Sequence, residues 1–214
     1  MTTLFPTTVD SDRLRFDPLH DAVAPLDLYE YHRSGEMDAV MRSLGETPHA
    51  TPRATLDDIT ESREAWTAGE RATYAITLRA TEEFVGVAEL WVEWEQRKTS
   101  FGIWLREPFW GRGYSAERAG AMAYVAFEPL DLELVSVGHE PDNERSKRSI
   151  ERYVETYGGQ YDGIVRNALP AGAVGGPRDL RTYTISQEQW RENVSDEERS
   201  TIRTGFEPTG ESAD

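Results

Sequence analysis

The stretch Trp110-Gly111-Arg112-Gly113-Tyr114-Ser115 divides the chain into two patterns. Three strand-like runs precede it, separated by short turns, and they cover residues 72–78, 84–94 and 100–105. A helical run rich in small residues (115–127) and an apolar strand (132–137) follow it. Short turns favour antiparallel neighbours, whereas a strand–helix–strand run needs a crossover. The stretch therefore lies where antiparallel hairpins give way to a crossover connection.

The flanking segments complete one α/β pattern. A strand at 11–18 and helices at 20–34 and 56–68 come first, the second helix behind a Thr55–Asp58 capping pair. A helix at 144–157 and strands at 161–169 and 180–186 come last. The order predicts an α/β (α+β) fold with a mixed, mostly antiparallel twisted sheet of about seven strands and about four helices. We expect one domain over residues 1–190. Residues 191–214 form an acidic C-terminal extension, partly helical or disordered, in which Ser195 and Glu198 form a capping pair.

The charge of the chain limits its partners. The net charge is -16 over 214 residues, which argues against nucleic acid and against anionic membranes, because both bind concentrated Lys and Arg. Lys98 and Lys147 are the only lysines among 23 basic residues. This composition resembles that of salt-adapted (halophilic) cytosolic proteins such as those of haloarchaea, in which carboxylates keep the surface hydrated.

Other classes of site are disfavoured by composition. The chain has no Cys and four scattered His, so we expect no disulfide, no cysteine nucleophile and no metal. The N-terminal segment lacks the charged and apolar regions of a signal peptide, and no apolar run approaches the length of a membrane span. We therefore expect a cytoplasmic protein.

Trp110 to Ser115 resembles the pyrophosphate-binding signature of the GCN5-related N-acetyltransferases (GNATs), Gln/Arg-x-x-Gly-x-Gly/Ala. Trp110 stands in the Gln/Arg position, Gly113 in the glycine position and Ser115 in the Gly/Ala position, so the first and last are departures. The longer run through Glu117 is similar to the RimJ/RimL-like branch, which acetylates the N-termini of ribosomal proteins.

Two downstream motifs follow in the family's order. Asn143 and Ser146 match the Asn-x-x-Ser start of a helix, and Tyr157-Gly158-Gly159 matches the end of that helix. The resemblance covers roughly residues 11–190, by comparison of motif order. It implies the GNAT fold, with the sheet splayed at its central crossover, and acetyl-CoA as cosubstrate.

The expected acetyl-CoA site combines a helix start with flexible backbone. Amide N–H groups and the helix dipole attract phosphates at a helix N-terminus, and glycines let the backbone approach them. Arg112 adds positive charge and Ser115 a hydroxyl. By the resemblance, the backbone of neighbouring strand residues borders the pantetheine, and Asn143 bonds either the pantetheine or the end of the strand. The implied contacts are Ile103, Leu105, Trp110, Gly111, Arg112, Gly113, Tyr114, Ser115, Ala116, Asn143 and Ser146.

Amide formation needs a base and an acid. Glu89 lies mid-strand and is our choice for the carboxylate that takes a proton from the substrate ammonium, against the alternative of a solvated strand face. The resemblance implies Ser146 as the acid that protonates the leaving thiolate. Alternatives are a local capping role for Ser146, and Tyr153 as the acid, itself open to a core role.

These observations predict an acetyl-CoA-dependent N-acetyltransferase. We favour a protein N-terminus of the ribosomal-protein type as the acceptor. A small amine (polyamine or aminoglycoside) and a non-catalytic, CoA-binding regulatory module remain alternatives. A homodimer is compatible with the sequence.

Overall fold

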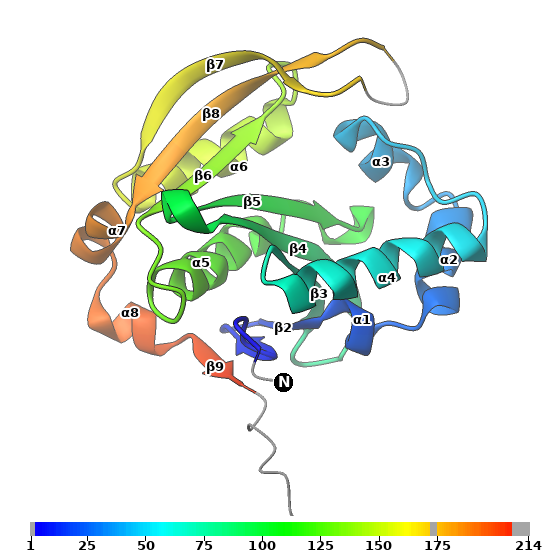
Figure 1. Cartoon of the computed structure of the whole chain (residues 1–214), viewed down its shortest axis with the longest axis horizontal. Coiled ribbons are helices and arrows are strands. Elements are labelled where there is room, and N and C mark those ends of the chain that lie inside the picture. The colour runs from blue at the N-terminus through cyan, green and yellow to red at the C-terminus, as the bar shows by residue number, and fades with distance from the viewer. Residues whose placement is uncertain (1–2, 172–174, 207–214) are drawn as a thin grey trace, which may run out of the picture.

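One sheet of nine strands forms the centre of the computed structural model, which describes residues 3–171 and 175–206. The strand order is β7-β8-β6-β5-β4-β3-β2-β1-β9 (Figure 1). The strands are β1 (Thr8–Asp10), β2 (Leu14–Pro18), β3 (Arg71–Leu78), β4 (Phe84–Glu93), β5 (Lys98–Leu105), β6 (Leu134–His139), β7 (Gln160–Leu169), β8 (Arg178–Ser186) and β9 (Arg203–Gly205). The predicted fold class is confirmed, and the short β1 and β9 account for the two strands beyond the predicted seven.

The sheet is antiparallel except between β5 and β6. These two strands pair in parallel only from Lys98 with Leu134 to Ser100 with Ser136. Beyond Ser100, β5 continues beside β4 as far as Leu105, while β6 continues beside β8 as far as His139. The two strands therefore separate toward their C-terminal ends, as the family resemblance implies.

Helices cover both faces of the sheet. They are α1 (Leu19–Ala22), α2 (Pro25–Arg33), α3 (Asp38–Leu44), α4 (Pro52–Ala68), α5 (Tyr114–Phe127), α6 (Glu144–Thr156), α7 (Gln187–Asn193) and α8 (Asp196–Ser200). Helices α5 and α6 pack with Ala88 and Leu90 of β4 in the main core. Helices α1, α2 and α4 pack with Val87 on the opposite face. Alternation along β4 thus separates two apolar layers.

The N-terminal helices differ from the sequence prediction. The helix expected over 20–34 is two helices, because the residue before Pro25 is disfavoured in helical conformation. Helix α4 begins at Pro52 with Thr51 as its N-cap, so the Thr55 cap was wrong; Pro is favoured at the first helical position, and Thr55 is fully buried.

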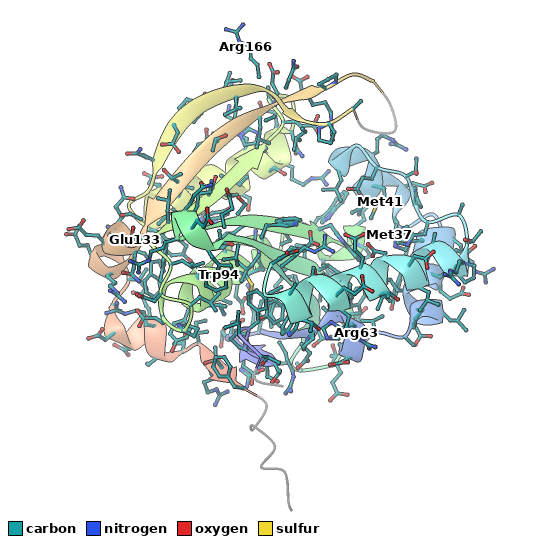
Figure 2. All side chains as sticks on the ribbon, in the orientation of Figure 1. Met37, Met41, Arg63, Trp94, Glu133 and Arg166 are labelled. Carbon is teal, nitrogen blue, oxygen red and sulfur yellow. The ribbon has the colours of Figure 1, made fainter. Side chains whose placement is uncertain are left out.

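Helix α3 was not predicted, and it packs on the sheet through a small apolar cluster. Met37, Val40 and Met41 contact Trp104 and Trp110, and Figure 2 labels both methionines on this segment. The helix therefore lies beside the point where β5 ends.

The segment after residue 190 also contacts the domain. Ser195 and Glu198 form the predicted capping box of α8, and β9 pairs with β1 in an antiparallel arrangement. Residues 207–214 of the expected extension lie outside the described residues.

Candidate active site

A cavity of ≈ 850 Å³ opens where β5 and β6 separate. Its walls come from the end of β5, the loop before α5, the first turns of α6 and helix α3. Two strands that diverge leave backbone N–H and C=O groups without a partner strand, and a bound ligand can form hydrogen bonds with them. The cavity is therefore the natural binding site of this fold.

The floor of the cavity is the N-terminal end of α5. Gly113 is its N-cap with φ 82°, and no side chain caps the helix. Gly111 has φ 74°, and a Cβ placed on it would meet no atom within 4 Å. The first amide N–H groups of a helix have no partner within the helix. Together with the helix dipole they form a binding site for an anion.

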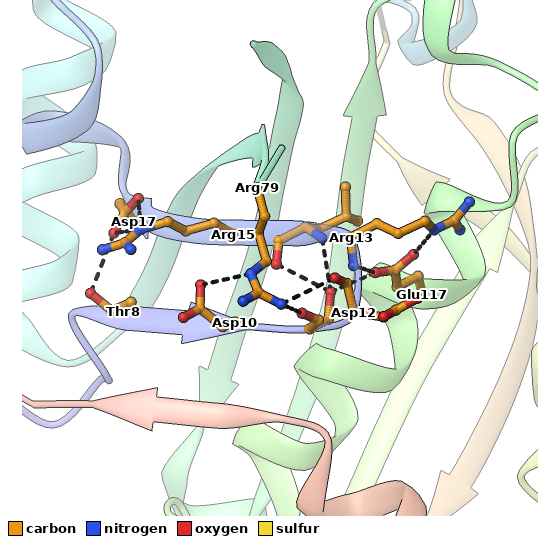
Figure 3. Close-up of polar contacts among 10 residues, drawn as sticks. Thr8, Asp10, Asp12, Arg13, Arg15, Asp17, Arg79 and Glu117 are labelled. Carbon is orange, nitrogen blue, oxygen red and sulfur yellow. Dashed lines mark hydrogen bonds and ion pairs between the residues drawn. The ribbon is translucent and has the colours of Figure 1, made fainter. Parts of the chain in front are cut away.

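The β1–β2 turn holds this loop from outside. Glu117 accepts hydrogen bonds from Ser11 Oγ and from Arg13 N and Nε, each at 2.7 Å (Figure 3). Arg13 in turn donates to the Arg112 carbonyl at 3.1 Å and lies over the Tyr114 ring. Arg13 and Glu117 therefore support the loop by direct contacts, which the sequence alone did not predict. The Glu that closes the aromatic-Gly-basic-Gly-Tyr run was the available signal.

Trp110 connects the loop to β5. Its Nε1 donates to the Leu105 carbonyl at 2.7 Å, and the Arg145 guanidinium lies 3.5 Å above its ring centroid. The hydrogen bond fixes the indole at the cavity wall, and the stacked arginine brings a positive charge beside the loop.

Helix α6 supplies the opposite wall. The Asn143 side chain caps this helix by accepting from the Ser146 N–H at 3.0 Å. The Ser146 hydroxyl makes no hydrogen bond to another described residue, and Ser146 lines the cavity. Ser149 Oγ donates to Ser115 Oγ at 2.9 Å, which joins α6 to the start of α5. Tyr153 is 2% exposed and lies in the core; burial raises the pKa of Tyr153 to about 12.

Glu89 lies on β4 outside the lining of this cavity. It faces Gly102 across the β4–β5 pair, where a Cβ would collide with the Trp91 ring and lie 3.1 Å from Glu89 Oε2. Trp104, two residues further along the same face of β5, does line the cavity. The separation along the strand is roughly 7 Å, so Glu89 lies two residues along the strands from the cavity wall at Trp104.

The charge state of Glu89 depends on burial. Burial raises the pKa of Glu89 to about 7, the Arg71 guanidinium opposes this, and the carboxylates of Asp58 and Glu46 reinforce it. Thr73 Oγ1 donates to Glu89 Oε1 at 3.4 Å. A carboxyl group with a pKa near neutrality has the proton affinity that a general base requires.

The structure brings together most of the predicted cofactor residues. Arg112 is exposed and does not line the cavity. The others that line it are Ile103, Leu105, Trp110, Gly111, Gly113, Tyr114, Ser115, Ala116, Asn143 and Ser146.

The family signature of the acetyltransferase (GNAT) domain matches residues 13–153 of the chain. The chain belongs to the GNAT acetyltransferase family. It is therefore an N-acetyltransferase by family, and GNAT enzymes act on amine acceptors. The matched span contains the loop before α5, the Asn143–Ser146 helix start and the splayed strands.

Solved structures share this GNAT fold. RimJ from Mycobacterium smegmatis in complex with CoA-disulfide is 18% identical, with 90% of this chain and 93% of that chain covered and a TM-score of 0.71. A provisionally assigned ribosomal-protein-serine acetyltransferase from Vibrio cholerae is 19% identical (84% and 97% covered, TM-score 0.63). The microcin C7 self-immunity acetyltransferase MccE in complex with acetyl-CoA and AMP is 15% identical (82% and 93% covered, TM-score 0.68). A search of curated proteins finds no match.

The geometry also bears on metal sites and membrane spans. Within residues 3–171 and 175–206, no group of three or more His, Asp or Glu side chains is placed to hold a metal ion. Over the same residues, no helix is long and apolar enough to cross a membrane.

Proposed function

We propose that this chain transfers the acetyl group of acetyl-CoA to the primary amine of a protein N-terminus. One observation carries the proposal: the cavity between the separating strands has the uncapped start of α5 as its floor. A pyrophosphate is the anion that suits several free backbone N–H groups at a helix start.

The residues present suit acetyl-CoA along the cavity. The loop from Gly111 to Ala116 receives the pyrophosphate. The end of β5 that has separated from β6, at Ile103 and Leu105, borders the pantetheine, and the Leu105 carbonyl there already accepts from Trp110 Nε1. Asn143 is occupied as the cap of α6, so its amide Nδ2 is the group that remains for the cosubstrate.

The reaction we propose is direct attack on the thioester. Glu89 takes a proton from the substrate ammonium, directly or through water. The neutral amine then forms a C–N bond with the acetyl carbonyl carbon, the C–S bond breaks, and the nitrogen loses its second proton to solvent to give the neutral amide. Ser146 donates a hydrogen bond or a proton to the departing sulfur, and solvent restores that proton. Tyr153 is buried away from the cavity, which favours Ser146 for this role.

The acceptor side is acidic. Glu46, Asp58 and Glu89 interact electrostatically, and burial is the largest cause of the raised pKa of each carboxyl group. A cationic amine that enters beside them relieves their repulsion. The preference for a protein N-terminus rests on the loop sequence and on the likeness to RimJ and to the Vibrio cholerae protein.

Thiol release from acetyl-CoA, measured with a panel of amines, tests the function. The panel holds peptides with free and with blocked α-amines, a polyamine and an aminoglycoside, each in low and high salt. We expect turnover with the free α-amine peptides and an acetylated product by mass spectrometry. Turnover only with the small amines would reassign the acceptor. CoA binding without turnover for any amine would contradict the enzyme and favour a regulatory module.

A further inference from the structure

Arginines without a carboxylate partner gather around the cavity. Twelve of the 21 arginines form an ion pair with a described carboxylate. Of the nine that pair with no described carboxylate, four line the cavity: Arg42, Arg145, Arg148 and Arg152. In a chain with 39 acidic and 23 basic residues, partners are abundant. The four unpaired cations therefore mark a site for an external anion.

The three arginines of α6 share one surface. Their spacing of three and four residues places Arg145, Arg148 and Arg152 on the same face of the helix, and all three are exposed. Arg42 comes from α3, across the cavity. Like charges at this spacing repel one another, and the carboxylates of Glu140, Asp142 and Glu144, which also line the cavity, offset part of that repulsion.

Arg145 also compensates for a departure in the loop. The signature position that holds Gln or Arg in the family is Trp110 here, which has no positive charge. The Arg145 guanidinium lies over the Trp110 ring, 3.5 Å from its centroid. Arg145 thus places a positive charge beside Trp110, in addition to the exposed Arg112 of the loop.

We propose that Arg145, Arg148 and Arg152, with Arg42, bind the 3′-phosphate of CoA and make the enzyme selective for 3′-phosphorylated CoA. This inference rests on the proposed function. The pyrophosphate takes the start of α5, so the arginines remain for a second anion. A phosphomonoester carries close to two negative charges at neutral pH and binds several guanidinium groups at once.

Isothermal titration calorimetry with CoA and dephospho-CoA, which differ only in the 3′-phosphate, tests the proposal. We expect the wild-type protein to bind CoA at least about tenfold more tightly, because charge-assisted hydrogen bonds are the strong ones. In the double variant Arg148→Gln/Arg152→Gln the two affinities become nearly equal, while that for dephospho-CoA stays within about twofold. Arg166→Gln is the matched control, since Arg166 is an exposed, unpaired arginine that projects from β7 (Figure 2); it leaves the preference intact.

Three results would overturn the proposal. They are equal wild-type affinity for the two ligands, an equal loss of both affinities in the double variant, and the same loss of preference in Arg166→Gln. A wild-type protein that binds neither CoA nor dephospho-CoA would reject the proposed function as well. Failure of the 3′-phosphate proposal alone is therefore distinguishable from failure of the proposed function.

Discussion

Replacing Glu89 with Gln separates its chemical role from its structural one. Burial raises the pKa of Glu89 to about 7, so the carboxylate is available as a base only above that pH. In the wild type, kcat/KM rises as the pH passes through about 7. Deprotonation of the peptide α-amine, whose pKa is about 7.7–8.0, adds a second rise to the pH profile of kcat/KM. The Glu89→Gln variant keeps only the rise that comes from the substrate amine. Its kcat/KM falls by about 100-fold or more, the usual contribution of a general base.

The pH dependence that Glu89 gives to stability runs opposite to the one it gives to activity. The ordinary pKa of a Glu carboxyl group is 4.5, and burial in the folded protein raises that of Glu89 to about 7. Glu89 therefore stabilises the folded state less as the pH rises between these two values, and the difference is worth about 3 kcal/mol, at 1.36 kcal/mol for each pKa unit. Glu89→Gln removes this dependence. Relative to the wild type, its melting temperature gains several degrees on going from pH 5 to pH 8, as measured by thermal unfolding.

Glu93→Gln is the matched control. Glu93 lies on the same face of β4, but it is exposed and pairs with Lys98 at 2.8 Å. It should change neither the pH profile nor the relative stability. A Glu89→Gln enzyme with the wild-type pH profile, or a Glu93→Gln enzyme with the same loss of activity, would refute the assignment of the base.

Three other substitutions test the cavity. Gly113→Asp raises the KM for acetyl-CoA by at least about tenfold, since a carboxylate at the helix start repels the phosphates; an unchanged KM removes the loop from the site. Ser146→Ala lowers kcat while the Kd for CoA, measured by calorimetry, stays within about threefold; a wild-type kcat would exclude the acid. Glu117→Gln weakens the contacts between this side chain and Arg13. Although residue 117 does not line the cavity, the Kd for CoA rises about tenfold because the loop is held less firmly. An unchanged Kd would show that the loop needs no external support.

Local motifs made the cofactor side predictable. The glycines at 111 and 113, the helix starts at Gly113 and Asn143, and their order along the chain are all properties of short segments. The splay of the sheet was predicted correctly from the family resemblance that these motifs carry. The predicted cofactor residues line the cavity because they lie at the end of a strand or around the start of a helix.

The other parts of the site could not be predicted because they depend on contacts between segments that are distant in sequence. Helix α3 has only the short pattern Met37, Val40 and Met41, and its packing on two tryptophans could not be read from spacing. The Glu117–Arg13 contact joins residues about a hundred positions apart. The raised pKa of Glu89 arises from burial and from Asp58 and Glu46, which are remote in sequence. The alternation of residues along β4 predicts on which face of the sheet Glu89 lies, but it does not predict that Asp58 and Glu46 lie near it.

Amide hydrogen exchange of the protein with and without CoA tests the location of the site most directly. We predict slower exchange on CoA binding in residues 103–116 and 143–152, two segments that contribute to the cavity lining, and unchanged exchange in β1, β9 and the α8 segment. Protection confined to other segments, or no protection at saturating CoA, would contradict the placement of acetyl-CoA between the separating strands.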